Sequence, residues 1–313
     1  MLPKYLSPKK SSKANVWLKS IVSLALYLLL GYYIFPSYAI LLLVTAIVII
    51  HEMGHFLAMK AYRYNELGIF FLPLLGAYVS GTKQEVSQKQ SAVIILAGPL
   101  PGIIIGILFI MIGNNDPNLQ LFGDRSMPFD LVGLLFLLLN LINLLPIYPL
   151  DGGQLLNRVF LDEESWIGKG FVILSAAFLV WVAWKLNFWI LLIFPVMMLL
   201  RMQGDRQFEE VEKRIEDEGI DLDIPYEELS DENYWRVRNI LIESHPAFRD
   251  IPPSPPYEYH EKEEKIMSAI QSLLHRRLIQ DVSIAGKILI ILLWVLAFAS
   301  PWLLDLNFTN WME

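Results

Sequence analysis

The chain has 313 residues, of which 55% are hydrophobic, and its mean hydropathy is +0.45. These values exclude an ordinary soluble protein, because the apolar residues gather in blocks close to the roughly 20 residues that cross a bilayer. The absence of cysteine excludes disulfide bonds and thiolate metal ligands. The net charge is −7, with most of the acidic excess between Asp205 and Asp281, and nothing in this distribution indicates a nucleic-acid partner.

The N-terminal region is basic and leads into apolar sequence that continues directly into a second apolar block. We therefore expect an uncleaved membrane anchor rather than a secretory signal. Lysine and arginine in the short loops gather on one side, which predicts a multi-pass integral membrane protein with a cytoplasmic N-terminus. The apolar blocks predict a polytopic transmembrane helix bundle with about seven spans, at residues 17–35, 38–59, 91–113, 129–150, 167–185, 188–202 and 284–304.

The sequence His51-Glu52-Met53-Gly54-His55 follows the apolar run 39–50. Two histidines four residues apart project from one face of a helix, so one zinc ion can bind a nitrogen of each. The glutamate between them is placed to act as a base on a zinc-bound water. Ionisable groups in hydrocarbon cost on the order of 3 kcal/mol each, so we expect a functional site: His51 and His55 as zinc ligands and Glu52 as the catalytic base.

Residues 67–81 are apolar but too short to cross a bilayer as a helix, and glycines and Pro73 interrupt them. This pattern favours a β-hairpin or a re-entrant segment over a helix. We expect a small membrane-associated β-hairpin here. At membrane depth its backbone must be covered by protein.

A third zinc ligand is expected from Asp151, within the sequence 143–153. Asp151 ends an apolar span on the side where the predicted topology also places the two histidines. Alternatively, its side chain could cap a helix beginning at the following two glycines. Two spans that deliver metal-type ligands to one depth favour the ligand role. Asn140, earlier in the same span, could either bridge two helices or contact a substrate.

Residues 203–280 are charged, and apolar residues at helical spacing predict short amphipathic helices, one of them capped by Ser230. The run Pro252–Pro256 predicts a stiff extended linker. A segment of this size and charge predicts a small cytoplasmic helical module rather than a large domain. The predicted domains are a transmembrane core at 1–202, an acidic module at 203–280 and a C-terminal transmembrane helix at 281–313.

Three motifs follow one another along the chain. They are the zinc motif, the sequence Ala97-Gly98-Pro99, and the Leu-Asp-Gly-Gly that follows an Asn-x-x-Pro. Together they resemble the site-2 protease family of intramembrane zinc metalloproteases. The resemblance covers about residues 38–158. The chain departs from the family at Gly102, where relatives commonly have asparagine, so this span need not supply a polar contact there, although close helix packing is expected.

The resemblance implies that Asp151 is the third zinc ligand, that Asn143 contacts the substrate, and that the hairpin at 67–81 lies near the active site. Zinc would lower the pKa of its bound water, and Glu52 would take the proton. A helical substrate hides its carbonyls in hydrogen bonds and must unwind before cleavage. The expected substrate-binding residues are Asn143, Pro146, Gly76 and Tyr78.

The predicted function is hydrolysis of peptide bonds in membrane-anchored proteins or remnant signal peptides, within or near the bilayer, with Zn²⁺ as cofactor. The expected partners are the membrane-anchored substrate and the lipid bilayer, with a cytoplasmic regulator at residues 203–280 as a candidate.

Two other functions fit parts of the pattern. A membrane metalloprotease of the prenyl-protein type would take a glutamate from a later helix as third ligand, and the later spans contain none. An ion- or proton-coupled transporter could use the buried His/Glu/Asp cluster. A transporter has no need of a base between two imidazoles at this spacing, so Glu52 distinguishes the two classes.

Overall fold

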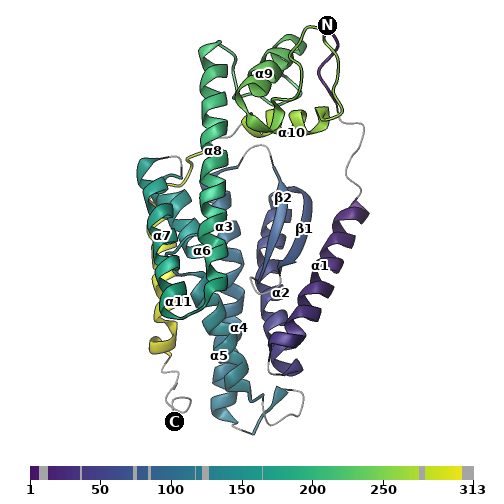
Figure 1. The fold of residues 1–313 in the computed structure, drawn as a ribbon. Helices are drawn as coiled ribbons and strands as arrows, with labels where there is room; N and C mark the ends of the chain where they lie inside the picture. Colours follow the sequence, from purple (N-terminus) through teal and green to yellow (C-terminus); the bar gives the residue numbers. More distant parts are fainter. Residues whose placement is uncertain are drawn as a thin grey trace. The chain divides into compact units, whose positions relative to one another are not determined.

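The computed structural model describes residues 1–6, 13–35, 37–72, 76–83, 86–116, 118–121, 127–163, 165–274 and 279–304. The chain divides into two compact units (Figure 1). The core unit comprises residues 11–83, 87–175 and 280–313. The appended unit comprises residues 1–10, 84–86 and 176–279.

Helices dominate both units. In and around the core unit they are α1 (Lys13–Ile34), α2 (Tyr38–Ala61), α3 (Gln88–Ala97), α4 (Pro99–Asn115), α5 (Phe129–Asn143), α6 (Asp151–Leu155), a π-helix (Leu156–Leu161), α7 (Trp166–Lys185) and α11 (Ile284–Leu303). The appended unit contains the end of α7, a 3₁₀-helix (Trp189–Leu192), α8 (Ile193–Asp217), α9 (Asp231–Ser244), a 3₁₀-turn (Pro246–Phe248) and α10 (Glu263–Leu273).

Among the described residues, five helices are long and apolar enough to cross a membrane by length and composition, as expected of an integral membrane protein. The third of them joins α3 and α4, and α5 is a shorter apolar helix. The predicted number of seven spans stays a prediction. The five are Asn15–Ile34, Tyr38–Ala61, Gln88–Asn115, Trp166–Lys185 and Ile284–Leu303.

The predicted β-hairpin is present. Strands β1 (Asn65–Leu72) and β2 (Gly76–Thr82) pair antiparallel, with Phe70 opposite Tyr78. Residues 73–75 of the turn, including Pro73, lie outside the described residues. The second strand begins at a φ of +100°, a conformation that glycine adopts without strain, so Gly76 suits the end of the turn.

Helix α1 covers the first strand. Tyr27 of α1 packs on Phe71 of β1 with ring centroids 5.9 Å apart, and Ile69 joins the same buried cluster. The backbone N–H of Phe71 donates to Ser23 Oγ of α1 at 3.1 Å. The outer edge of β1 is therefore partly capped by α1.

Helices α4 and α5 cross at glycines. A Cβ on Gly106 would lie 2.9 Å from the carbonyl oxygen of Gly133, and one on Gly133 would lie 2.5 Å from that of Gly106. Only small residues permit so close an approach of two backbones. The span predicted to run to Leu150 is wrong in its extent, because α5 ends at Asn143. Pro146 and Pro149 have no backbone N–H and cannot continue a helix.

The appended unit has its own hydrophobic core, which includes Val211 and Ile215 of α8, Trp235 and Leu241 of α9, and Ile270 of α10. As predicted, Ser230 caps α9, accepting from the N–H of Asn233 at 3.2 Å. Helix α8 runs without interruption across the predicted domain boundary at residue 203.

The proline-rich segment lies against α9. The Asn239 side chain donates to the Ser254 carbonyl at 2.8 Å and accepts from its N–H at 2.9 Å. Ile251, just before the segment, is 2% exposed. This part of the chain is therefore packed into the unit.

Candidate metal centre

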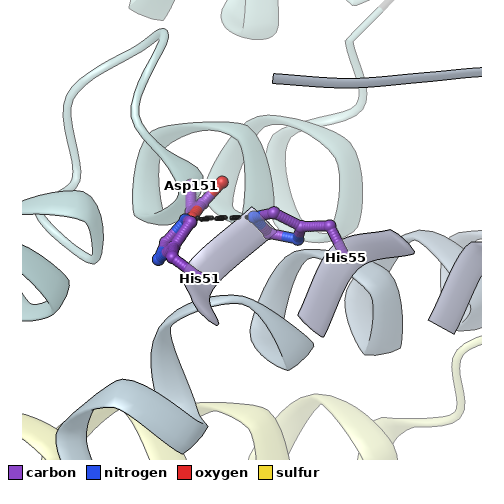
Figure 2. A group of neighbouring side chains, drawn as sticks. All are labelled: His51, His55 and Asp151. Atoms are coloured by element: carbon purple, nitrogen blue, oxygen red, sulfur yellow. Dashed lines mark hydrogen bonds and ion pairs between the residues drawn. The ribbon is translucent and has the colours of Figure 1, made fainter. Parts of the chain in front are cut away.

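Three predicted metal ligands lie together in the core unit. Figure 2 shows Asp151 pointing between the imidazole rings of His51 and His55. The Nε2 atoms of the two histidines are 3.1 Å apart. Asp151 Oδ2 lies 3.0 Å from Nε2 of His51 and 3.4 Å from that of His55. The three side chains are buried and form a group that could hold a metal ion.

The hydrogen bonds of the outer ring nitrogens fix the state of both histidines. His55 Nδ1 lies 2.7 Å from the Ile94 carbonyl oxygen, which can only accept, so this nitrogen carries the proton. His51 Nδ1 lies 2.8 Å from Asn140 Oδ1. The Asn140 amide nitrogen is engaged with the Phe136 carbonyl at 2.7 Å, so its oxygen faces His51 and accepts from it as well.

Both Nε2 atoms are therefore left as lone-pair acceptors when the histidines are neutral. They converge with a carboxylate oxygen, Asp151 Oδ2, which is buried and has no hydrogen-bond partner of its own. Three acceptors at this separation repel one another unless a cation lies among them. The donor chemistry of the site thus fits a metal ion.

The spacing fits zinc in particular. Four-coordinate zinc binds nitrogen and carboxylate oxygen at about 2.0–2.2 Å, which places neighbouring ligand atoms about 3.3–3.6 Å apart in a tetrahedron. The observed separations of 3.0–3.4 Å are close to this. Two histidines and one carboxylate leave a fourth position for water, the arrangement of a catalytic rather than a structural site.

Glu52, the predicted base, lies next to the predicted metal ligands. It lies in α2 between the two histidines and is 6% exposed. A carboxylate in this position can exchange a proton with a water molecule at the metal.

The motif Ala97-Gly98-Pro99 makes room for the histidine helix. A Cβ on Gly54 would lie 1.9 Å from the Ala97 carbonyl oxygen, so α2 passes directly over the end of α3. A Cβ on Gly98 would lie 2.3 Å from His55 Nε2. Pro99 then starts α4, where a missing N–H costs nothing. The motif therefore serves close packing around His55.

Gly102 makes room for the partner of the other histidine. A Cβ there would lie 2.2 Å from Asn140 Nδ2 and 2.6 Å from Oδ1. Asn140 is 1% exposed and joins α5 to His51 on α2. Of the two roles left open for it, the helix bridge is the one the structure contains. The sequence alone did not identify its target, because that depends on space at a residue 38 positions earlier.

A tight turn positions Asp151 at the start of α6. Asp151 occupies the first position of α6, whose N-cap is Leu150 with no side-chain cap. The alternative that Asp151 itself caps this helix is therefore excluded. A Cβ on Gly152 would lie 2.0 Å from the Leu144 carbonyl oxygen, and one on Gly153 would lie 2.3 Å from Tyr148 N. The two glycines let α6 begin directly against the preceding turn.

The predicted substrate contacts lie in different environments. Asn143 is half-buried and donates to the Leu139 carbonyl at 3.2 Å. Pro146 is exposed, Tyr78 on β2 is 48% exposed, and Gly76 starts that strand. None of these observations tests a substrate, so the four assignments stay predictions.

Comparison with known proteins agrees with this chemistry. Residues 39–123 match the family model of Peptidase family M50. The chain is 29% identical over 123 residues to a zinc metalloprotease of Methanocaldococcus jannaschii, covering 38% of this chain and 34% of the relative. It is 31% identical over 120 residues to stage IV sporulation protein FB of Bacillus subtilis, covering 38% of this chain and 40% of the relative.

The matched region thus spans only a third to two fifths of the length of these two relatives. Among solved structures, the chain is similar to a site-2 protease from Methanocaldococcus jannaschii, with a TM-score of 0.42 and 22% identity over 58% of this chain and 84% of that one. The family match at residues 39–123 lies within the range 38–158 covered by the motifs, and it contains both histidines, Glu52 and Ala97-Gly98-Pro99, whereas Asp151 lies beyond it.

Proposed function

We propose that this chain, whose residues 39–123 match the family model of Peptidase family M50, is an intramembrane zinc metalloprotease that cleaves membrane-anchored proteins or remnant signal peptides within or near the bilayer. The observation that carries the proposal is the convergence of three buried acceptor atoms beside Glu52. We also propose that the N-terminus is cytoplasmic and that about seven spans hold the chain in the membrane, as the lysine and arginine distribution predicts.

The bound zinc would supply a Lewis acid that lowers the pKa of water and stabilises negative charge on a peptide carbonyl. His51, His55 and Asp151 would hold it, with the Asn140 amide and the Ile94 carbonyl fixing the two rings. Glu52 would take a proton from the attacking water and return it to the leaving amine. Because Glu52 is buried, this transfer occurs where bulk water is excluded.

The second strand of the hairpin is the better candidate for binding an unwound substrate. In an antiparallel pair, main-chain groups point alternately toward the partner strand and away from it. The N–H of Phe71 points away from β2, toward Ser23. The main-chain N–H and C=O of its pairing partner Ala77 therefore also point outward, on the side of β2 away from β1. Two residues on, the pair Ile69–Val79 repeats this orientation. Ala77 and Val79 therefore present main-chain groups to which a substrate strand could pair.

The test is cleavage of a reporter with one membrane span by purified protein in lipid nanodiscs. The wild type is expected to cleave it, and Glu52→Gln to lose about 10²–10⁴-fold of the rate, the size of a general base contribution, while retaining zinc. Glu216→Gln, an exposed glutamate of α8, is the matched control and should cleave normally. Full activity in Glu52→Gln would overturn the proposal.

A further inference from the structure

The first six residues of the chain lie on the appended unit without forming a helix or strand. Figure 1 shows the N-terminus beside α9 and α10. Three aromatic side chains from separate parts of this unit contact the segment, and we call them, with the loop 226–229, the N-terminal docking site. They are Tyr226, Trp235 and Tyr259.

The aromatic residues of the docking site bind main-chain carbonyl groups. Each uses its single polar hydrogen, so that an otherwise apolar surface acquires three directed donors. Such contacts are independent of the side chain of the bound residue and hold the segment in one position. Trp235 Nε1 donates to the Leu2 carbonyl at 2.7 Å, the Tyr259 hydroxyl to the Pro3 carbonyl at 2.5 Å, and the Tyr226 hydroxyl to the Tyr5 carbonyl at 2.6 Å.

The contacts of Lys4 make the docking site specific for a lysine side chain at this position of the segment. An ammonium group has three donors, and those of Lys4 meet three carbonyl oxygens of one loop, at 3.0 Å for Tyr226, 2.5 Å for Glu227 and 2.6 Å for Leu229. The backbone N–H of Lys4 donates to Asp231 Oδ1 at 2.8 Å. A side chain without three donors would leave at least one of these oxygens without its present partner.

Tyr5 is the second side chain that the site binds. Its ring packs against the hydrophobic core of the appended unit and meets Tyr259 edge-to-face with centroids 5.2 Å apart. In contrast, Leu2 is 41% exposed and Leu6 is 67% exposed. The docking site therefore recognises mainly the lysine and the aromatic residue that follows it. The side chains of Leu2 and Leu6 are more exposed and contribute less.

The docking site rests on a rigid base. Trp235 is 1% exposed and stacks on Tyr259 with centroids 6.0 Å apart. The Arg238 guanidinium lies 4.9 Å from the Trp235 ring and is itself paired with Glu263. A site whose side chains are already fixed loses little conformational entropy when a peptide binds.

From these contacts we infer that the appended unit is a peptide-recognition module, whose ligand is a segment bearing a lysine followed by an aromatic residue, and that the chain's own N-terminus is its bound ligand. The inference does not rest on protease activity. A ligand in the same chain competes with any free ligand through its effective concentration. A partner with such a segment must displace residues 1–6 from the docking site.

The first test uses a full-length chain lacking only residues 2–6, with the fluorescent peptide Met-Leu-Pro-Lys-Tyr-Leu as probe. Fluorescence anisotropy should show saturable binding to this variant and about tenfold or weaker binding to the wild type, whose site is occupied. A peptide with alanine at the lysine position should bind about tenfold more weakly, because it loses hydrogen bonds from a charged group. A peptide with alanine at its sixth position should match the original within about twofold, because Leu6 is 67% exposed and its side chain contributes little buried area.

The second test keeps the N-terminus in place and so does not depend on folding of the shortened chain. The chain has no cysteine, so Leu2→Cys carries the only thiol and can be labelled with a bimane dye that Trp235 quenches on contact. Excess peptide should restore the fluorescence, and Lys4→Ala in the same chain should restore it without peptide. Trp235→Phe removes the quencher and sets the upper limit.

Two results would overturn the inference. One is equal binding of the lysine and alanine peptides by the shortened chain, or no binding of either. The other is a labelled full-length chain whose fluorescence is the same with and without Lys4→Ala.

Discussion

Both units of the molecule bury ionisable side chains, but the hydrogen-bond partners of these side chains differ between the units. In the appended unit, Glu263 and Arg238 are each 1% exposed and joined by hydrogen bonds of 2.7 and 3.1 Å. Glu263 also accepts from the Tyr234 hydroxyl at 2.6 Å and from the His260 N–H at 3.0 Å. In the core unit, two imidazole nitrogens and one carboxylate oxygen meet, and none of them is a donor when the histidines are neutral.

The difference distinguishes a network that stabilises the fold from a cluster that could bind an added group. A buried network in which donors and acceptors match is complete without any added group, and it fixes how two helices pack. A buried cluster of acceptors alone is incomplete, and it persists only if an added cation completes it. Arg238 with Glu263 therefore joins α9 to α10, whereas His51, His55 and Asp151 form a group that could hold a metal ion.

The largest effect is expected from breaking the complete network. Arg238→Ala leaves the Glu263 charge buried without its partner, which should destabilise the appended unit by about 3–5 kcal/mol. The double variant Arg238→Met with Glu263→Leu should recover most of this, because no unpaired charge remains. Hydrogen–deuterium exchange of the α9 and α10 amides measures the change. Unaltered exchange in Arg238→Ala would show that the pair contributes nothing.

The next effect concerns the support of the metal ligands. Asn140→Ala removes the acceptor of His51 Nδ1, and zinc affinity should fall about 10–100-fold, as for other partners of metal ligands. Gly102→Ala should do the same, because its methyl group would displace the Asn140 amide. Competition with a chelator measures both affinities.

The two substitutions should not be additive. Once Asn140 is alanine, the extra methyl at residue 102 has no amide to displace, so the double variant should bind zinc like Asn140→Ala alone. Gly170→Ala, where an added Cβ would meet nothing within 4 Å, is the matched control. Strictly additive losses would contradict the proposed contact between Gly102 and Asn140.

A smaller effect is expected at the hairpin, where the outward main-chain groups of β2 have no partner strand among the described residues. Val79→Pro removes an outward N–H of β2 and should reduce cleavage several-fold, to about tenfold if one backbone hydrogen bond to substrate is lost. Val79→Ala keeps the N–H and controls for the lost side chain. Zinc content should be normal in both. Equal cleavage by the two variants would remove this edge from the mechanism.

The mildest perturbation is acidification. Burial raises the pKa of Glu263, but hydrogen bonds from Arg238, Tyr234 and the His260 N–H outweigh it and hold the pKa below its ordinary value. The stability from this group is therefore complete above its unfolded pKa of about 4.3 and is lost as the pH falls further. The protection factors of the α9 amides, which are corrected for the intrinsic pH dependence of exchange, should fall below that pH in the wild type, and less so in the Arg238→Met, Glu263→Leu variant. Identical pH profiles would contradict this.

Local pattern was enough to predict that the two histidines share one face and that the hairpin forms. The spacing of His51 and His55 depends only on helix geometry, and the glycines and β-branched residues of 67–81 act within a few residues of one another. Asp151 was found because the order of spans placed it at the depth of the histidines. These features are determined by short segments of the chain and by the membrane.

Features that depend on distant residues could not be predicted. Asn140 reaches His51 only because Gly102 leaves space on another helix. Helix α5 ends at Asn143 where apolar sequence continues, since the turn before Asp151 must fold back on α6. The docking of residues 1–6 on Trp235 joins positions more than 230 residues apart, and no local pattern in the sequence indicates it.

The most direct test of the account is the zinc content of the purified chain by elemental analysis. Three converging acceptors predict one zinc per chain in the wild type and in Glu52→Gln, and its loss in His51→Ala and Asp151→Ala, with the α9 exchange pattern unchanged in all four. A wild-type chain that cleaves its substrate without zinc, or an Asp151→Ala chain that keeps a full equivalent, would contradict it.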